Sequence, residues 1–277
     1  MIRAEQVGYS YNGAGQTVSD LTFHIEKGEF VAVIGENGAG KTTTVKLIDG
    51  LLRPTSGRML VNGLDTAKSK VSERAKQVGF LFQNPDRQIC QNTVREEIAF
   101  GLRAVWGKKE TARIDERVNE LLALFSFTGD EEPFSLSRGQ RQQVALASTL
   151  AIGPAVLILD EPTTGLDYRE CTRIMEFIRA LNEKEGTTVV MVCHDMEVVL
   201  DYARRALVMA QGRILADGPV RELFRDADLM KRASLMPPQM IELSGRLGGD
   251  LALADDAETL ARMIAEKTAA EDGRRTV

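Results

Sequence analysis

The chain has 277 residues, of which 35 are Lys or Arg and 40 are Asp or Glu, so that its net charge at pH 7 is −5. A chain of this length holds one large domain, or one domain with a small appendage, and can bury about three quarters of its unfolded surface without disulfide support. The acidic balance argues against a general nucleic-acid-binding protein. The three cysteines, Cys90, Cys171 and Cys193, lack metal-ligand spacing and are expected to be reduced thiols.

The first third of the chain contains a complete phosphate-loop motif. Residues 2–27 alternate weakly between apolar and polar positions, which predicts short antiparallel strands joined as a hairpin. The β-branched run at residues 30–34 predicts a strand buried on both faces. Residues 35–42 then fit G-x-x-x-x-G-K-[ST] at every fixed position, and residues 43–48 continue as a helix that ends near Gly50.

The loop at residues 35–42 predicts a site for a nucleoside triphosphate. Its glycines let successive N–H groups converge on phosphate oxygens that a Cβ atom would obstruct. The helix that begins here adds the positive end of its dipole. Lys41 can reach the β- and γ-phosphates, and the Thr42 hydroxyl can ligate Mg²⁺. A glycine-rich turn without a ligand is the alternative, and the complete motif between a strand and a helix argues against it.

The middle of the chain predicts two strands and two amphipathic helices. Residues 57–63 predict a strand that ends in an Asn-Gly turn, and residues 78–82 a short buried strand that leads into a loop at Pro85. The helices are predicted at residues 93–106 and 114–125. Their apolar stripes are expected to pack into the core rather than to face a partner.

The second half of the chain alternates between helices and strands. Helices are predicted at residues 137–152 and 169–184, and strands at residues 156–159 and 187–193. This alternation predicts an α/β fold with a mostly parallel sheet covered on both faces. Beyond Gly218 the pattern changes.

The C-terminal part of the chain predicts a small helical region. Residues 237–238 are a Pro-Pro breaker, residues 256–270 predict a helix rich in Ala, Glu and Lys, and residues 271–277 are expected to be frayed.

Two carboxylates, Asp160 and Glu161, follow the predicted strand at residues 156–159. Sheets of this class bind ligands at the carboxyl ends of their strands. One carboxylate suits the shell of a Mg²⁺ ion, and its neighbour can orient or deprotonate an attacking water. His194 follows the next predicted strand at the same sheet edge, and this placement predicts a catalytic role for it.

In their order and spacing these motifs resemble those of an ABC-transporter ATPase. The matching positions are residues 35–42, Gln83, residues 136–140, residues 157–161, residues 164–167 and His194. The Leu-Ser-x-Gly-Gln signature at residues 136–140 discriminates this family from other phosphate-loop ATPases.

The resemblance covers about residues 1–225, and it implies a phosphate-loop NTPase of ABC type as the ATP-binding domain. In this fold N-terminal antiparallel strands accompany the mostly parallel core. A helical subdomain is expected at about residues 84–150, and residues 226–277 would form a small helical C-terminal extension.

The resemblance also implies a role for each residue on the phosphate-loop side of the site. ATP would be contacted by Gly35, Glu36, Asn37, Gly38, Ala39, Gly40, Lys41, Thr42 and Thr43, with Tyr11 stacked on the adenine. Tyr9 is interpreted as a packing residue. Mg²⁺ would be held by Thr42, Gln83 and Asp160.

Four residues would be catalytic by the same resemblance, namely Lys41, Gln83, Glu161 and His194. Gln83 would touch Mg²⁺ and sense the γ-phosphate, Glu161 would be the base, and His194 would hold the γ-phosphate and the water.

A second set of residues would serve the ATP bound by the opposite subunit of a head-to-tail dimer. Ser137, Gly139 and Gln140 would close over that ATP, and Asp167 would communicate across the dimer. Ser137 is expected to cap the helix that follows it. The first glycine of the family signature is replaced by Arg138. Its guanidinium either points to solvent or adds a charge-assisted contact to the γ-phosphate.

Within the family, residues 82–88, 93–94 and 97–101 look like the ATPase of energy-coupling-factor importers, which take up vitamins or transition-metal ions such as cobalt and nickel. The implied function is an ATP-hydrolysing subunit that powers such an importer by ATP-driven closure of a dimer. Residues 84–88 would lie near the groove that receives the coupling helix of a membrane partner.

The implied partners are a second ATPase subunit, identical or paralogous, a transmembrane coupling subunit and a substrate-binding membrane subunit, with no nucleic acid. No apolar run approaches the roughly 20 residues that span a bilayer, so another chain would provide the membrane part. The protein would then be peripheral on the cytoplasmic face of the membrane.

Two alternatives are open from the sequence. A conventional ABC importer or exporter ATPase would have the same chemistry and a different membrane partner. A soluble ABC ATPase of DNA repair or translation belongs to another class. Such repair proteins carry a long coiled coil between the phosphate loop and the signature, and such translation factors carry two cassettes, whereas this sequence has one phosphate loop and no such coiled coil.

Overall fold

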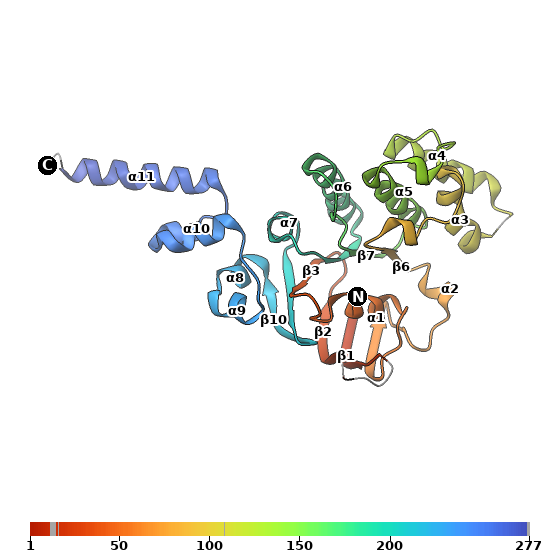
Figure 1. The fold of residues 1–277 in the computed structure, drawn as a ribbon, viewed down its shortest axis with the longest axis horizontal. Coiled ribbons are helices and arrows are strands. Elements are labelled where there is room, and N and C mark those ends of the chain that lie inside the picture. The colour runs from red at the N-terminus through yellow and green to blue at the C-terminus, as the bar shows by residue number, and fades with distance from the viewer. Residues whose placement is uncertain (12–14, 16, 108, 276–277) are drawn as a thin grey trace.

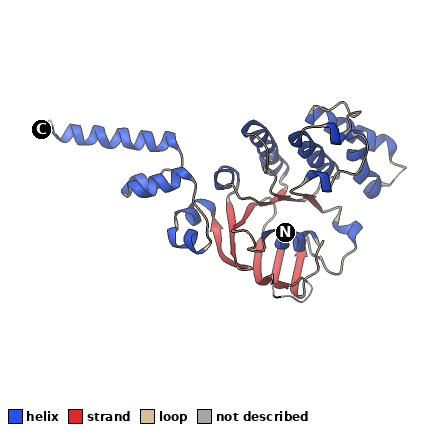
Figure 2. Cartoon of the chain, viewed as in Figure 1, coloured by secondary structure: helices blue, strands red, loops and turns tan. Residues whose placement is uncertain are grey.

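The computed structural model describes residues 1–11, 15, 17–107 and 109–275. Two β-sheets form the centre of the molecule, a group of helices lies on one side and a helical arm leaves on the other (Figures 1 and 2). One sheet has four strands in the order β2-β1-β4-β5, and the other has six in the order β10-β9-β3-β8-β7-β6.

The four-stranded sheet is antiparallel. It consists of β1 (Ile2–Tyr9), β2 (Val18–Ile25), β4 (Ser56–Val61) and the short β5 (Leu64–Asp65). In this register Ile2 lies opposite both Ile25 and Val61, and the inward-facing apolar side chains of the three strands form one buried layer. The antiparallel N-terminal strands predicted from the alternating pattern are confirmed.

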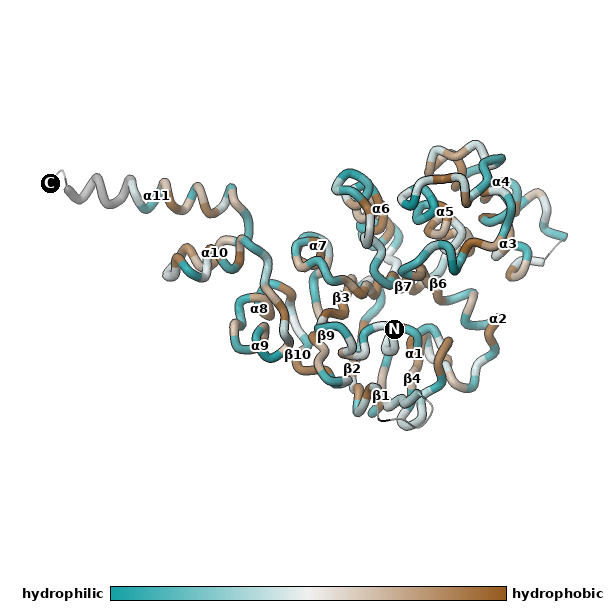
Figure 3. Tube along the Cα trace, in the orientation of Figure 1, coloured by the Kyte–Doolittle hydropathy of each residue, from teal (hydrophilic) through white to brown (hydrophobic). Residues whose placement is uncertain are grey.

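The six-stranded sheet carries the site. Five of its strands are parallel, namely β3 (Phe30–Gly35), β6 (Val78–Leu81), β7 (Val156–Asp160), β8 (Thr188–Val192) and β9 (Arg205–Ala210). The edge strand β10 (Arg213–Pro219) is antiparallel to β9. Every residue of β3, β7 and β8 is buried, which explains their nearly continuous apolar sequences (Figure 3). Strands β9 and β10 are not among the predicted elements.

Helices cover this sheet on both faces, as predicted. Helix α1 (Lys41–Asp49) packs between the two sheets. The other face is covered by α3 (Val94–Trp106), α4 (Thr111–Phe125), α5 (Arg138–Ala151), α6 (Tyr168–Glu185) and α7 (Met196–Tyr202), with the short α2 (Val71–Arg74) before β6. The apolar stripes of α3 and α4 face the core, with Ile98, Leu102 and Leu121 buried. The expectation that these stripes are core is confirmed.

The C-terminal region begins after β10. It comprises α8 (Val220–Arg225), α9 (Ala227–Arg232), α10 (Gln239–Leu247), a 3₁₀ helix (Gly249–Leu253) and α11 (Ala257–Arg275). Arg221 and Arg225 both pair with Asp255 and fix the start of the last segment. Helix α11 runs to Arg275 and so includes residues 271–275, whose expected fraying stays a prediction. Residues 276–277 lie outside the described part of the chain.

Candidate functional site

The phosphate loop joins β3 to α1 through backbone conformations that glycine adopts readily. Gly35 has φ +152°, and a Cβ atom there would collide with the carbonyl oxygen of Met209. Gly40, directly before α1, has φ +97°, and a Cβ atom on it would lie 2.6 Å from the Cγ1 atom of Val18. No side chain caps α1 at Gly40. The first N–H groups of this helix therefore face the loop, where an anion can bind them.

Lys41 is held inside this loop. Its Nζ atom donates to the carbonyl oxygens of Gly35 (2.8 Å) and Glu36 (2.9 Å), and the residue is 6 % exposed. Burial lowers the pKa of Lys41, and the carboxylates of Glu161, Asp160 and Glu36 oppose that shift. The ammonium group is thus positioned by backbone oxygens, and a phosphate chain would meet it already in place.

A hollow of about 180 Å³ lies over the loop and gathers residues that are far apart in the sequence. Its lining consists of Thr17, Asn37, Gly38, Gly40, Lys41, Thr42, Thr43, Glu161 and His194. All except Thr17 are among the predicted site residues. Thr17 gives no motif signal, because it reaches the loop only through the packing of the start of β2 against Gly40.

Thr42 and Asp160, two of the three residues predicted to hold Mg²⁺, lie next to each other. The Thr42 Oγ1 atom donates to Asp160 Oδ1 at 3.2 Å, and Asp160 is 4 % exposed. Burial raises the pKa of Asp160, and the hydrogen bond from Thr42 opposes the rise. The described residues contain no cluster of three or more His, Cys, Asp or Glu side chains that could hold a metal. Two adjacent oxygen ligands nevertheless fit Mg²⁺, which keeps waters and takes substrate phosphate oxygens as its other ligands.

The carboxylate of Glu161 contacts two other predicted catalytic residues, Gln83 and His194. Its Oε2 atom accepts hydrogen bonds from Gln83 Nε2 (2.7 Å) and Thr164 Oγ1 (3.1 Å), and its Oε1 atom lies 3.0 Å from His194 Nε2. The structure therefore brings Gln83, Glu161 and His194 together, as the motif pattern implies. Thr164 lies within the matched segment at residues 164–167, and no role was predicted for its side chain.

The backbone of Glu161 is in the left-handed region, with φ +54°. This conformation is uncommon for a residue with a long side chain and persists where the surrounding structure holds it. Here the hydrogen bonds of the carboxylate with Gln83 and Thr164 supply that support.

Tyr11 lies at the exposed end of the first hairpin. Its ring is 42 % exposed and meets the Tyr9 ring edge-on, with centroids 4.8 Å apart and an interplanar angle of 87°. Tyr9 packs against the core of the antiparallel sheet. One ring is thus open to a ligand and the other is structural, and the stacking of Tyr11 on adenine stays a prediction.

The signature lies at the start of α5, apart from the phosphate-loop hollow. The Ser137 Oγ atom accepts from Gln140 N (3.2 Å), and Gln140 Oε1 accepts from Ser137 N (3.0 Å). The predicted cap at Ser137 is confirmed. Ser137 and Gln140 line a different hollow of about 390 Å³ together with Glu170. Within one chain, the predicted ATP-contacting residues therefore form two separate sets.

Two further contacts tie the signature to α6. A Cβ atom on Gly139 would collide with the carboxylate of Glu170, which lies directly over this glycine. Asp167 caps α6, because its Oδ1 atom accepts a hydrogen bond from Glu170 N at 2.8 Å. In turn, the Glu170 Oε2 atom accepts one from Asp167 N at 3.3 Å. Glu170 was not predicted, and a capping box is the only signal for it in the sequence.

The C-terminal extension lies beside Glu161 and His194. A hollow of about 590 Å³ is lined by Glu161 and His194 on one side and by Met236, Pro237 and Pro238 on the other. The Gln239 N–H donates to Glu197 Oε1 at 2.8 Å, which fixes this segment beside α7. The Pro-Pro breaker predicts the turn but gives no indication that the turn faces the site.

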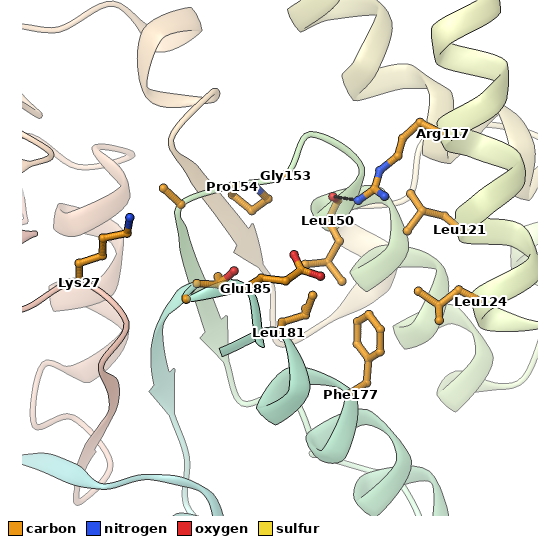
Figure 4. Close-up of a pocket in the computed structure, with 13 residues that line it drawn as sticks. Lys27, Arg117, Leu121, Leu124, Leu150, Gly153, Pro154, Phe177, Leu181 and Glu185 are labelled. Atoms are coloured by element: carbon orange, nitrogen blue, oxygen red, sulfur yellow. Dashed lines mark hydrogen bonds between the residues drawn. The ribbon is translucent and has the colours of Figure 1, made fainter. Parts of the chain in front are cut away.

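Another hollow, of about 440 Å³, lies at the opposite edge of the sheet (Figure 4). Its lining includes Lys27, Phe177 and Glu185, and Arg117 donates there to the carbonyl oxygen of Leu150 at 3.3 Å. It contains none of the predicted site residues.

In the part of the chain that the structure describes, no helix combines the length and the apolar character needed to cross a bilayer.

Comparison with known proteins identifies the family. Residues 18–164 match the sequence profile of the family described as ABC transporter. A putative ABC transporter ATP-binding protein of Caldanaerobacter subterraneus subsp. tengcongensis is 45 % identical over 250 residues, which are 90 % of this chain and 43 % of that protein. The energy-coupling factor transporter ATP-binding protein EcfA of Methanothermobacter thermautotrophicus is 39 % identical over 251 residues, 89 % of this chain and 80 % of that protein. The chain thus spans less than half the length of the first relative.

Solved structures agree with this fold. CbiO1 from Clostridium perfringens, described as part of the ABC transporter complex cbiONQ, has a TM-score of 0.74 and 30 % identity, over 89 % of this chain and 96 % of that one. A dimeric ATP-binding cassette bound to ADP and Pi after hydrolysis has a TM-score of 0.71 and 28 % identity, over 79 % of this chain and 99 % of that one. With the family profile matching more than half of its length, the chain belongs to the ABC transporter family and carries an ATP-binding cassette of that family.

Proposed function

We propose that the chain powers a membrane importer of the energy-coupling-factor type, which takes up a vitamin or a transition-metal ion. The likeness to EcfA and to CbiO1 supports this type, because each covers 89 % of the chain. The observation that carries the hydrolytic part is the convergence of Gln83, Thr164 and His194 on the carboxylate of Glu161.

Binding of ATP would begin at the uncapped N-terminus of α1. The N–H groups of the loop would take the phosphate oxygens, and Lys41 would bind the β- and γ-phosphates from its buried position. Tyr11 would stack on the adenine ring. Thr42, Asp160 and Gln83 would hold Mg²⁺, which when bound neutralises charge on the β- and γ-phosphate oxygens.

Hydrolysis would be carried out by the cluster around Glu161. Its carboxylate would accept a proton from the attacking water while the water oxygen bonds to the γ-phosphorus and the bond to the ADP oxygen breaks. His194, 3.0 Å from the carboxylate, would hold the γ-phosphate and the water in line. Gln83, 2.7 Å from the same carboxylate, would orient Glu161 and respond to the γ-phosphate.

A single chain would offer only half of each ATP site, because its signature and its phosphate loop lie in different hollows. A second ATPase subunit, identical or paralogous, would place its own signature over the ATP on this chain. The solved dimeric cassette with ADP and Pi is an example of such an arrangement in a similar protein.

The loop after Gln83 would receive a transmembrane coupling subunit. Asp86 pairs with Arg141 of α5 at 2.7 Å, and Gln88 donates to Ala145 O (3.0 Å) and Thr149 Oγ1 (2.8 Å) of the same helix. A membrane partner seated at residues 84–88 would therefore move the signature helix together with Gln83. The chain would be peripheral on the cytoplasmic face, and a separate membrane subunit would bind the cargo.

A conventional ABC importer or exporter is the second candidate. The relative with 45 % identity is compatible with it, because that protein carries only the general name of an ABC transporter ATP-binding protein. Co-purification of the tagged chain from membranes, with identification of the bound chains, distinguishes the two. A small coupling subunit with a separate cargo-binding subunit is the expected result. A pair of large transporter subunits would instead identify a conventional transporter.

A further inference from the structure

We infer that Arg138 is a positioning residue that links the signature to the catalytic carboxylate of the same chain, and thereby couples the two ATP sites of a dimer. The inference rests on the proposed function, since it concerns how the signature acts on hydrolysis. It concerns the one signature position where this sequence departs from the family pattern.

The first observation is where the Arg138 side chain lies. Its Nε, Cζ and Cδ atoms are 2.9, 3.0 and 3.3 Å from the position that a Cβ atom on Gly165 would take. The stem and guanidinium of Arg138 therefore rest against the Cα atom of Gly165, although the residue is exposed as a whole. Gly165 has φ +78°, so this close approach depends on a glycine there.

Gly165 is the neighbour of Thr164, which is hydrogen-bonded to Glu161. It belongs to the 162–166 segment, which joins Glu161 to α6. The preceding residue, Thr164, donates from Oγ1 to Glu161 Oε2 at 3.1 Å and from its backbone N–H to Glu161 O at 3.3 Å. A displacement of Gly165 would therefore move Thr164, and with it a hydrogen bond that orients the base.

The strained backbone of Glu161 makes this connection consequential. With φ +54°, Glu161 keeps its conformation only while its neighbours hold it. Thr164 is one of those neighbours, and Arg138 packs beside it on Gly165. The path from the signature to the base thus runs through three residues: Arg138, Gly165 and Thr164.

The two ends of this path would serve different ATP molecules. The signature at the start of α5 would close over the ATP of the opposite subunit, whereas Glu161 would act on the ATP of its own subunit. Binding at the first site would shift α5, and Arg138 would pass that shift to Thr164 and Glu161. A glycine at position 138 would remove the packing on Gly165, whereas the contact of Gly139 with Glu170 and the hydrogen bond from Gln142 Nε2 to Pro162 O (3.3 Å) would remain between α5 and the α6 side.

The contact is one of packing. Within the part of the chain that the structure describes, the Arg138 side chain makes no hydrogen bond or ion pair, and the atoms that approach Gly165 are Cδ, Nε and Cζ. Lysine and methionine extend a stem over the same positions, methionine without a charge. Both should therefore preserve the coupling, whereas a direct contact with phosphate would require the charge.

The test is steady-state ATPase activity against MgATP concentration for the full chain and for Arg138→Gly, Arg138→Met, Arg138→Lys and Thr164→Val. We expect a sigmoidal curve for the unmodified chain, with a Hill coefficient between about 1 and about 2, the number of sites. Arg138→Gly should lower the Hill coefficient toward about 1 and lower kcat by less than roughly tenfold. Arg138→Met and Arg138→Lys should retain the sigmoidal curve.

Thr164→Val should flatten the curve as Arg138→Gly does, and the double variant should be no flatter than either single one, because both residues lie on one path. Binding of a fluorescent ATP analogue to the phosphate loop should be unchanged by Arg138→Gly, which a general loss of structure would not allow.

Three results would overturn the inference. A curve as steep in Arg138→Gly as in the unmodified chain would remove the coupling role, and so would a hyperbolic curve in the unmodified chain. Loss of the sigmoidal curve in Arg138→Met, together with a raised KM, would assign Arg138 to phosphate contact instead if Arg138→Lys alone kept the curve sigmoidal. No ATP hydrolysis by the unmodified chain would overturn the proposed function itself, and this outcome is distinct from the other three.

Discussion

The phosphate loop and the signature each present the N-terminus of a helix, and the two termini are built in opposite ways. Helix α1 begins at Gly40 without a side-chain cap, beside a buried Lys41. Helix α5 begins with a complete capping box between Ser137 and Gln140, on an exposed surface. A capped terminus already satisfies one of its first N–H groups, whereas an uncapped one leaves them for a ligand.

This difference assigns the two regions different tasks. The phosphate loop is prepared for an anion in the single chain, because its backbone, its lysine and its helix terminus need no rearrangement. The signature is stable without a ligand, since the hydroxyl of Ser137 is already engaged with Gln140. The Ser137 Oγ atom only accepts in this contact, so its hydroxyl hydrogen stays available to donate to a phosphate oxygen of a bound ligand. We therefore expect the loop to determine ATP affinity and the signature to determine turnover.

The largest effect on turnover is expected for Glu161→Gln. The amide keeps hydrogen bonding with Gln83 and Thr164 but cannot accept a proton, so kcat should fall on the order of 100- to 10,000-fold. ATP affinity should be preserved, and an ATP-bound dimer should accumulate. Single-turnover hydrolysis and light scattering with MgATP measure both. Near-normal turnover would show that the base is another residue.

Gly139→Asp tests the signature alone. The new side chain would displace the Glu170 carboxylate and place a negative charge where phosphate is expected, so kcat should fall at least about 100-fold. Binding of ATP to the loop should be unchanged. Gly245→Asp is a matched control, because a Cβ atom there meets nothing within 4 Å. An active Gly139→Asp variant would mean that the signature does not close over ATP in this protein.

Lys41→Ala tests the loop alone. Removing the buried ammonium should weaken MgATP binding roughly 10- to 100-fold, the range expected for hydrogen bonds to a charged group. Lys27→Ala removes the same charge from the opposite sheet edge and should leave affinity unchanged (Figure 4). Equilibrium binding of a fluorescent ATP analogue measures both variants. Equal affinities for the two would contradict the phosphate-loop assignment.

The smallest effect on turnover is expected for Asp49→Asn, at the far end of α1. Burial raises the pKa of Asp49 to about 6 from its ordinary value of 3.8, and Arg74 opposes the rise. A carboxyl whose folded pKa is raised favours the folded state while protonated, and this contribution is lost as the pH rises from about 4 through about 6.

The asparagine side chain has no proton to lose, so the variant should be more stable than the unmodified chain by about 1 to 3 kcal/mol near pH 7.5. The difference should vanish near pH 4, where Asp49 is largely protonated in the folded state. Urea unfolding at the two pH values measures it. An equal gain at both would show that the charge of Asp49 is not the cause. ATPase activity should be unchanged, because Asp49 is the last residue of α1 and the phosphate loop lies at the other end of that helix.

The sequence predicts well those site residues that follow the carboxyl ends of parallel strands. Asp160 is the last residue of β7, Lys41, Glu161 and His194 follow a buried strand or its loop, and parallel pairing brings these ends to one sheet edge. The missed strands β9 and β10 had a usable signal. An apolar run at residues 206–210 precedes Gln211 and Gly212, and a glycine at this place is typical of a hairpin turn.

Contacts between helices were harder to predict. Glu170 over Gly139 and Arg138 over Gly165 depend on how closely the starts of α5 and α6 approach, and these lie about 30 residues apart in the sequence. No local pattern encodes that approach, because it is set by packing across the core. The same holds for the Pro-Pro turn beside His194, which depends on where the C-terminal extension folds back.

The final helix bears on how the protein should be measured in solution. Helix α11 has 19 residues, which at about 1.5 Å each makes an arm of about 28 Å, and it extends away from the sheets (Figure 1). Such an arm increases translational friction without adding much mass. A chain of 30.5 kDa with this shape will elute from a gel-filtration column ahead of a spherical protein of equal mass. Monomer and dimer must therefore be distinguished by scattered light or sedimentation equilibrium, because elution volume alone would overestimate the size of the single chain.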